Sequence, residues 1–278
     1  MNFKRFISAL LCVILSVSFL FLFGCADGNT DVTTTKADGE AVTDSVSEKV
    51  TENVTAAEIP SASDETTTQA AEENKAPETV EEIVACFNAS ANRIKTEATK
   101  VTKNFEKRYN DSSKLIVPDA LMSTADKMMS TFMKDDTDPI VYATKEEIVS
   151  EYIVPDQNYV SKLTADAVKE AKCTDKGDTY EIYIKLKDEK NPTAGKGVGS
   201  VCDVIEAHEI AEKAPSMLKE MSTYYYDCTI TVTVDKASGR VTHAVYKTPL
   251  VMHMIVNLLG THEVQAGITF TKDYSIEY

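Results

Sequence analysis

The sequence predicts an α+β domain, built from an antiparallel and curved sheet that two or three helices pack against. Helical periodicity dominates the start and middle of the folded part, whereas strand-like alternation fills most of its last 55 residues. Short turn segments such as Asp235 to Gly239 separate the alternating runs, which indicates an antiparallel meander. The roughly 200 residues from 78 to 278 have the length of a single domain.

Residues 1–24 have the three parts of a secretory signal peptide. Lys4 and Arg5 precede an uncharged apolar run from Phe6 to Phe23, and the small residue Gly24 follows. Such a segment is removed from the mature protein. The apolar run is almost as long as the roughly 20 residues that span a bilayer, so an uncleaved membrane anchor is the alternative.

The end of this leader favours cleavage with lipid attachment. Leu22, three positions before Cys25, and Gly24, directly before it, resemble the lipobox of bacterial lipoproteins. The resemblance implies that Cys25 is acylated and that the protein is held on the extracellular face of the cell membrane. Two or more acyl chains anchor stably because each buried methylene contributes about 0.8 kcal/mol.

Residues 25–77 are predicted to form a disordered tether. Thr, Ala, Ser, Asp and Glu dominate this segment, and aromatic residues are absent from it. Such a composition buries too little apolar surface to offset the entropy of ordering. A transient helix is the alternative, because Val42, Val46, Val50 and Val54 recur every four residues. The segment carries most of the chain's net negative charge, which argues against nucleic acid as a partner.

The best-defined helix is predicted to begin after Thr79. Thr79 can cap the helix, and Glu82 supplies the reciprocal partner of a capping box. The apolar residues follow helical spacing and form one stripe, comprising Val80, Ile83, Val84, Phe87, Ala91 and Ile94. From about Thr99 the pattern changes to alternation, which predicts a strand with Val101, Lys103, Phe105, Lys107 and Tyr109 on one face.

A second helix is predicted from Pro118 to about Met133, and it is rich in methionine. Methionine is flexible and common on adaptable apolar binding surfaces, so this helix could line a ligand site together with Phe87. The candidate lining residues are Phe87, Met122, Met128, Met129, Phe132 and Met133. The alternative is that the same residues only fill the core.

The middle of the chain predicts shorter elements. These are a weak strand at 151–154, a turn of helix at 163–169, a hairpin at 171–186, a loop at 192–200 and helical segments within 201–221. The C-terminal part then predicts strands at 224–234, 241–246, 250–257 and 264–276. Tyr224, Tyr225 and Tyr226 must alternate between the two faces of their strand.

The hairpin phrase from Thr233 to Val241 and the order of elements are similar to those of extracytoplasmic lipoprotein carriers of the LolA and LppX type. The overall composition also resembles that of lipoproteins of clostridial-type Gram-positive bacteria. The first resemblance implies a curved sheet that holds acyl chains or glycolipids between the sheet and its helices.

Four cysteines, Cys86, Cys173, Cys202 and Cys228, remain in the folded part of the chain. They allow three pairings into two disulfides, and the sequence leaves open whether none, one or two disulfides form. An exported location favours pairing. A buried free cysteine, however, also behaves as an ordinary small apolar residue.

Catalytic and metal-binding patterns are weak, so we expect no enzyme and no cofactor. The four histidines lack zinc-site spacing. Glu206, His208 and Glu209 could coordinate a metal or shuttle protons, but a solvated helix face is the favoured interpretation of these residues. A hydrolase that uses His208 or His253 is the remaining catalytic hypothesis.

Two non-catalytic functions therefore remain. The leading hypothesis is a membrane-anchored extracytoplasmic lipoprotein that binds a lipid or another hydrophobic small molecule between sheet and helices. The alternative is a structural or protein-binding module of the cell envelope, which predicts a filled core and an exposed apolar or tyrosine-rich patch.

Overall fold

The structure is a computed structural model that describes residues 75–213, 218–257 and 260–278, and residues 76–278 belong to one compact unit. The predicted leader, Cys25 and nearly all of the predicted tether lie outside the described residues. Among the described helices, none combines the length and the apolar character needed to cross a membrane.

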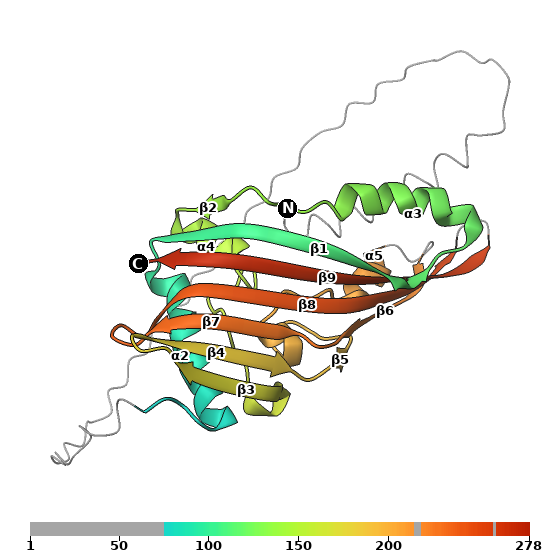
Figure 1. The fold of residues 1–278 in the computed structure, drawn as a ribbon. Helices are drawn as coiled ribbons and strands as arrows, with labels where there is room; N and C mark the ends of the chain where they lie inside the picture. Colours follow the sequence, from blue (N-terminus) through green and yellow to red (C-terminus); the bar gives the residue numbers. More distant parts are fainter. Residues whose placement is uncertain (1–74, 214–217, 258–259) are drawn as a thin grey trace, which may run out of the picture. The chain divides into compact units, whose positions relative to one another are not determined.

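One antiparallel sheet of nine strands forms the framework (Figure 1). Its main path runs β2-β1-β9-β8-β7-β4-β3, and β6 pairs with both β5 and β8. The strands are β1 (Lys100–Ile116), β2 (Ile140–Tyr142), β3 (Val168–Asp175), β4 (Thr179–Leu186), β5 (Glu189–Lys190), β6 (Leu218–Tyr225), β7 (Thr229–Asp235), β8 (Arg240–Asn257) and β9 (Thr261–Glu277). The sheet does not close, and the predicted α+β class is confirmed.

Strand β8 organises the sheet. It pairs with β9 along nearly its whole length, while its other edge pairs first with β7 and then with β6. The sequence predicts a break near Pro249, but β8 continues through it. The Pro249 carbonyl accepts a hydrogen bond from Tyr226 at the junction of β7 and β6, so the missing N–H falls where the pairing changes strands.

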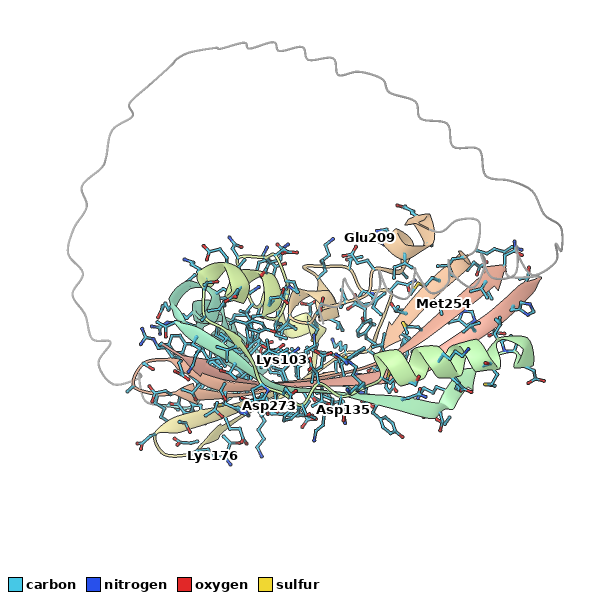
Figure 2. The ribbon with its side chains drawn as sticks, turned by 90° about the horizontal axis from the view of Figure 1, so that it is seen from above. Lys103, Asp135, Lys176, Glu209, Met254 and Asp273 are labelled. Carbon is cyan, nitrogen blue, oxygen red and sulfur yellow. The ribbon has the colours of Figure 1, made fainter. Side chains whose placement is uncertain are left out.

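Helix α2 (Val80–Glu97) has the predicted start, because Thr79 and Glu82 form both bonds of a capping box. Its stripe is buried against the sheet, with Phe87 and Ile83 almost fully covered. Helices α2, α4 (Lys145–Glu151) and α5 (Ala207–Lys213) lie on one side of the sheet, which we call the inner face. In Figure 2, Met254 lies on this side and Asp273 on the opposite, outer face.

The strand predicted at 151–154 is wrong. Residues 145–151 form α4 instead, and the short strand β2 precedes it. Thr144 and Glu147 form a second capping box, which fixes the start of this helix. Val154 then takes a positive φ of 57°, a conformation that a β-branched residue adopts only under strong local constraint.

The helical prediction for residues 201–221 is correct only for α5. Leu218 and Met221 belong to the strand β6, which pairs with β8. The strand predicted at 224–234 is two strands, because β6 ends at Tyr225 and β7 begins at Thr229. A short 3-10 helix lies at Ala165–Ala167, within the turn of helix predicted at 163–169. A second one lies at Gly197–Ser200, at the end of the predicted loop.

Helix α3 (Asp119–Phe132) confirms the second predicted helix and lies beside the C-terminal half of β1 (Figure 1). Next to this helix, Met133 packs against the core, as does Leu121 within it. The hairpin between β3 and β4 also forms as predicted, and Gly177 supplies the positive φ of its turn.

Candidate functional site

A β-bulge in β1 brings opposite charges together on the inner face. The pairing of β1 with β9 shifts between Lys103 and Phe105, and Asn104 is the extra residue. Asn104 donates hydrogen bonds to Asp273 and Ser275 on β9, at 2.6 and 2.9 Å. The strand therefore reverses its alternation at this point, and Lys103 and Glu106 both become buried.

The bulge corrects the predicted facing of β1. The sequence predicts Val101, Lys103, Phe105 and Lys107 on one face. Phe105 and Lys107, however, pair with Asp273 and Thr271 of β9, and they therefore lie on the outer face with them. Nothing in the local sequence marks this shift. The charged residues gathered by it were consequently missed as candidates.

Six charged side chains form what we call the charged cluster: Lys103, Glu106, Arg108, Asp136, Asp203 and Lys272. Glu106 accepts from Lys103 at 3.2 Å and from Arg108 at 2.8 Å. The Lys103 ammonium also lies 3.5 Å from the Asp136 carboxylate. The backbones of Asp136 and Glu106 pair with each other in an isolated antiparallel β-bridge. The Lys272 ammonium and the Asp203 carboxylate lie 3.7 Å apart.

Glu106 is ionised at neutral pH despite its burial. Desolvation acts to raise the pKa of Glu106, but the positive charges of Lys272, Lys103 and Arg108 outweigh it and hold that pKa at about 2. Removing any one of these positive partners would leave the buried carboxylate incompletely neutralised, which strongly destabilises a fold. The charged cluster is therefore a fixed polar region within an otherwise apolar inner face.

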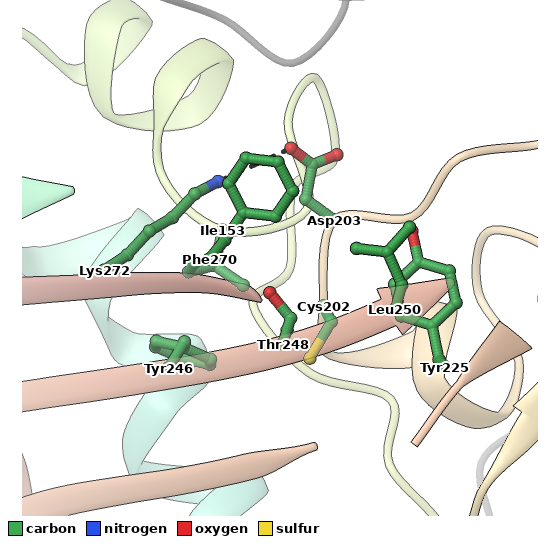
Figure 3. Close-up of a pocket in the computed structure, with 9 residues that line it drawn as sticks. All are labelled: Ile153, Cys202, Asp203, Tyr225, Tyr246, Thr248, Leu250, Phe270 and Lys272. Atoms are coloured by element: carbon green, nitrogen blue, oxygen red, sulfur yellow. Dashed lines mark ion pairs between the residues drawn. The ribbon is translucent and has the colours of Figure 1, made fainter. Parts of the chain in front are cut away.

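A crevice adjoins the charged cluster at Asp203 and Lys272 (Figure 3). Its lining is Ile153, Cys202, Asp203, Tyr225, Tyr246, Thr248, Leu250, Phe270 and Lys272. The space inside is about 10 Å³, which is room for about one water molecule. Lys272 and Asp203 lie at one end of the crevice, beside Phe270, and Leu250 and Tyr225 lie at the other.

The apolar end of the crevice continues along two strands. Leu250, Met252, Met254 and Val256 of β8 and Ile268 and Phe270 of β9 are buried, and we call these six residues the inner apolar strip. Alternate residues of each strand supply it, because they share the inner face. The strip meets the polar end of the crevice near Lys272.

The predicted ligand-lining residues lie elsewhere or cannot be placed. Phe87 is buried under α2, Met133 is partly buried against the core, and the Met122 side chain is exposed. The side chains of Met128, Met129 and Phe132 lie outside the described structure, as does Cys25. The crevice is instead lined by residues from β6, β8 and β9 and from the segments after α4 and before α5.

The three consecutive tyrosines alternate as expected. Tyr225 is buried, and its hydroxyl accepts a hydrogen bond from the backbone N–H of Ile205. Tyr224 and Tyr226 lie on the outer face with their rings stacked, 6.1 Å between centroids. Tyr109 is the most exposed large apolar residue there, at 66%. Tyr109, Tyr224 and Tyr226 share the outer face, with β9 and β8 between Tyr109 and the stacked pair, and we call these three residues the outer tyrosine patch.

Glu206, His208 and Glu209 lie close together at the start of α5. Their ligand atoms fall within 4.8 Å of one another, so this predicted group is one that could hold a metal ion. The Glu206 carboxylate, however, already accepts a hydrogen bond from Ala194 and lies 3.7 Å from His208. His208 and Glu209 are exposed, and a solvated helix start accounts for the arrangement equally well.

Two other histidines pair with carboxylates on the outer face. His253 lies 2.9 Å from Glu263, and His243 lies 3.1 Å from Asp273. Ser275 is opposite His243 in the sheet, but the Ser275 hydroxyl accepts a hydrogen bond from Asn104. Activation of a serine needs a base within hydrogen-bond reach of it. The described contacts contain no such bond between Ser275 and His243.

Comparison of the chain with protein-family models, with curated proteins and with solved structures found no match.

Proposed function

We propose that this chain is an extracytoplasmic lipoprotein, anchored through acylated Cys25, whose domain binds an amphipathic lipid-like ligand without catalysis. The lipobox-like leader and the tether composition support the location. The observation that carries the binding proposal is the position of the inner apolar strip, which runs directly into the charged cluster. An amphipathic molecule offers the same succession of apolar and polar parts.

The length of the strip suits an acyl chain. Leu250 to Val256 comprises seven strand residues, which cover about 20 Å at about 3.3 Å per residue. One leaflet of a bilayer core is about 15 Å deep, since the whole core is about 30 Å thick. The strip can therefore contact most of an acyl chain of a common membrane lipid.

The volume of the crevice sets a condition on this proposal. Small-molecule sites usually occupy at least about 300 Å³, whereas the crevice has room for about one water molecule. A ligand must therefore separate elements that now pack together. Helix α5 lies on the inner face and packs on β6, the neighbour of β8, so its displacement is the movement that this proposal requires.

Native mass spectrometry tests the proposal. The chain from residue 25 onward, with Cys25→Ser, should retain a lipid-sized mass that is lost on denaturation. Met254→Gln should reduce the bound fraction by roughly tenfold, because it places a polar group on the strip. Ile255→Gln is the matched control on the opposite face of the same strand, and it should leave binding unchanged.

The outer tyrosine patch favours a second candidate, a protein-binding module of the envelope. Tyr109 and Tyr224 are 66% and 43% exposed, and tyrosine is enriched in protein interfaces. This candidate needs no opening of the crevice. It would be preferred if the protein carried no lipid-sized mass and if Tyr109→Ala with Tyr224→Ala abolished capture of an envelope protein.

A further inference from the structure

The polar end of the crevice contains both hydrogen-bond donors and acceptors. The Lys272 ammonium and the Asp203 carboxylate both line it, 3.7 Å apart. This separation exceeds a normal hydrogen bond, so a third group can bridge the two. Figure 3 shows this ion pair at the edge of the crevice, with Thr248 below it. A bridging group must accept from Lys272 and donate to Asp203.

Tyr246 adds a second polar requirement. Its side chain lines the crevice and is buried, yet among the described atoms its hydroxyl has no hydrogen-bond partner. Burial raises the pKa of Tyr246 and the nearby Tyr152 hydroxyl acts against this rise, but the two hydroxyls do not meet at hydrogen-bond geometry. A buried hydroxyl without a hydrogen-bond partner lowers the stability of the folded state.

The six side chains of the charged cluster carry equal numbers of positive and negative charges, and Lys95, whose charge also acts on Asp203, is accompanied by Asp156. Lys103, Arg108 and Lys272 are matched by Glu106, Asp136 and Asp203. An anionic group placed here would meet the carboxylates of Asp203 and Glu106 without a spare cation. A cationic group would meet three positive side chains in the same way. In a poorly hydrated site, an added unpaired charge is strongly disfavoured.

We therefore propose, resting on the function proposed above, that the crevice selects a ligand with an uncharged headgroup that bears hydroxyls. A hydroxyl both donates and accepts, so one such group can bridge Lys272 and Asp203. The present space of about one water molecule matches one hydroxyl oxygen. Acylglycerols and glycolipids belong to this chemical class, whereas phosphatidic acid, free fatty acids and long-chain alkyl amines do not.

Three probes with hydrocarbon chains of the same length and unsaturation test the selection: monoolein, oleate and oleylamine. Each is titrated against the chain from residue 25 onward with Cys25→Ser, and binding is followed by native mass spectrometry. Monoolein should bind at least tenfold more tightly than either charged probe. Equal or tighter binding of oleate or oleylamine would overturn the headgroup inference while leaving lipid binding intact. Failure of all three probes to bind would overturn the proposed function.

Variants of the ion pair sharpen the result. Asp203→Asn leaves an excess positive charge at the crevice, so the preference should move towards oleate. Lys272→Met leaves an excess negative charge and should move it towards oleylamine. Lys247→Met, which is exposed on the outer face, is the matched control and should keep the wild-type order. If a crevice variant fails to fold, the order measured for the wild-type protein decides the question.

Discussion

Lys103 and Glu106 are three residues apart in one strand, yet their charged groups lie 3.2 Å apart on the same face of the sheet. Regular alternation would put residues three apart on opposite faces. The bulge at Asn104 removes this separation, and Asn104 is held by Asp273 and Ser275 of the next strand. The position of one extra residue thus determines that a charged cluster exists on the inner face.

Glu106→Gln should destabilise the domain by about 3–5 kcal/mol. The substitution keeps the shape of the side chain but leaves Lys103 and Arg108 buried without their shared partner. Urea unfolding followed by circular dichroism measures the change. Glu263→Gln, at an exposed ion pair, should cost less than about 1 kcal/mol. A similar small cost for both variants would show that the cluster contributes little.

The Glu106 carboxylate should make the stability of the fold depend on pH in the acidic range. The pKa of Glu106 is about 2 in the folded protein, against an ordinary value of 4.5. A lowered pKa stabilises the fold above the ordinary value, and this contribution disappears as the pH falls from about 4.5 towards 2. The loss amounts to about 3 kcal/mol, since one pKa unit corresponds to about 1.4 kcal/mol.

Urea midpoints measured between about pH 2 and pH 6 test this dependence. The wild-type protein should lose more stability on acidification than Glu106→Gln, and the difference between them isolates this group from other carboxylates. Parallel pH profiles for the two proteins would contradict the assignment.

Lys95→Met should loosen the segment between α4 and the core. The Lys95 ammonium donates to the carbonyls of Val149, Val154 and Gln157, at 3.3, 2.8 and 3.0 Å. Burial lowers the pKa of Lys95 to about 8, against the opposing charges of Asp156 and Asp203. We expect the ammonium form at neutral pH, because three carbonyls accept from it.

Removing this donor leaves three carbonyls without their partner and should cost about 2–4 kcal/mol. Hydrogen exchange should accelerate in residues 149–157 before it does in β8. The exposed substitution Lys172→Met serves as the control and should change neither quantity. Unchanged exchange in 149–157 would mean that the ammonium does not hold this segment.

The four thiols should fall into two reactivity classes. Cys202 and Cys228 are buried, and burial raises the pKa of Cys202 to about 12 and that of Cys228 well above its usual value. Cys86 and Cys173 are only partly buried. All four are free in this structure. With Cys25→Ser, a thiol reagent at about pH 8 should therefore modify Cys86 and Cys173 first.

Peptide mapping after partial modification identifies which cysteines react. Cys202 and Cys228 should become reactive only after denaturant is added. Modification of all four at one rate in the folded protein would contradict the burial described here, and a protein without free thiols would show that disulfides form.

Local signals predicted the elements that depend on local contacts. The capping box of Thr79 and Glu82 begins α2, and the Asp and Gly residues after β3 form the expected turn. The same capping signature at Thr144 was missed, because only Ile148 is buried in the short α4 that follows. Leu218 and Met221 have helical spacing, yet pairing with β8 makes their segment a strand.

The candidate site depended on long-range geometry and was therefore beyond sequence reasoning. Lys272 and Asp203 are far apart in the chain, and both have ordinary surroundings in the sequence. The predicted lining residue Phe87 follows the helical stripe correctly, but α2 packs on β3 and β8 at the end of the sheet where β8 begins. The bulge in β1 and the pairing of strands that are distant in the sequence, such as β1 with β9, decide which residues meet, and neither has a sequence signature here.

Photo-crosslinking with an acyl chain that carries a diazirine tests most directly whether a ligand lies on the inner face. The proposed function predicts that the label is found on peptides from β8 and β9, at Leu250 to Val256 and at Ile268 to Phe270, and that excess monoolein suppresses it. Labelling confined to the outer tyrosine patch, or labelling that excess monoolein does not reduce, would contradict the proposal.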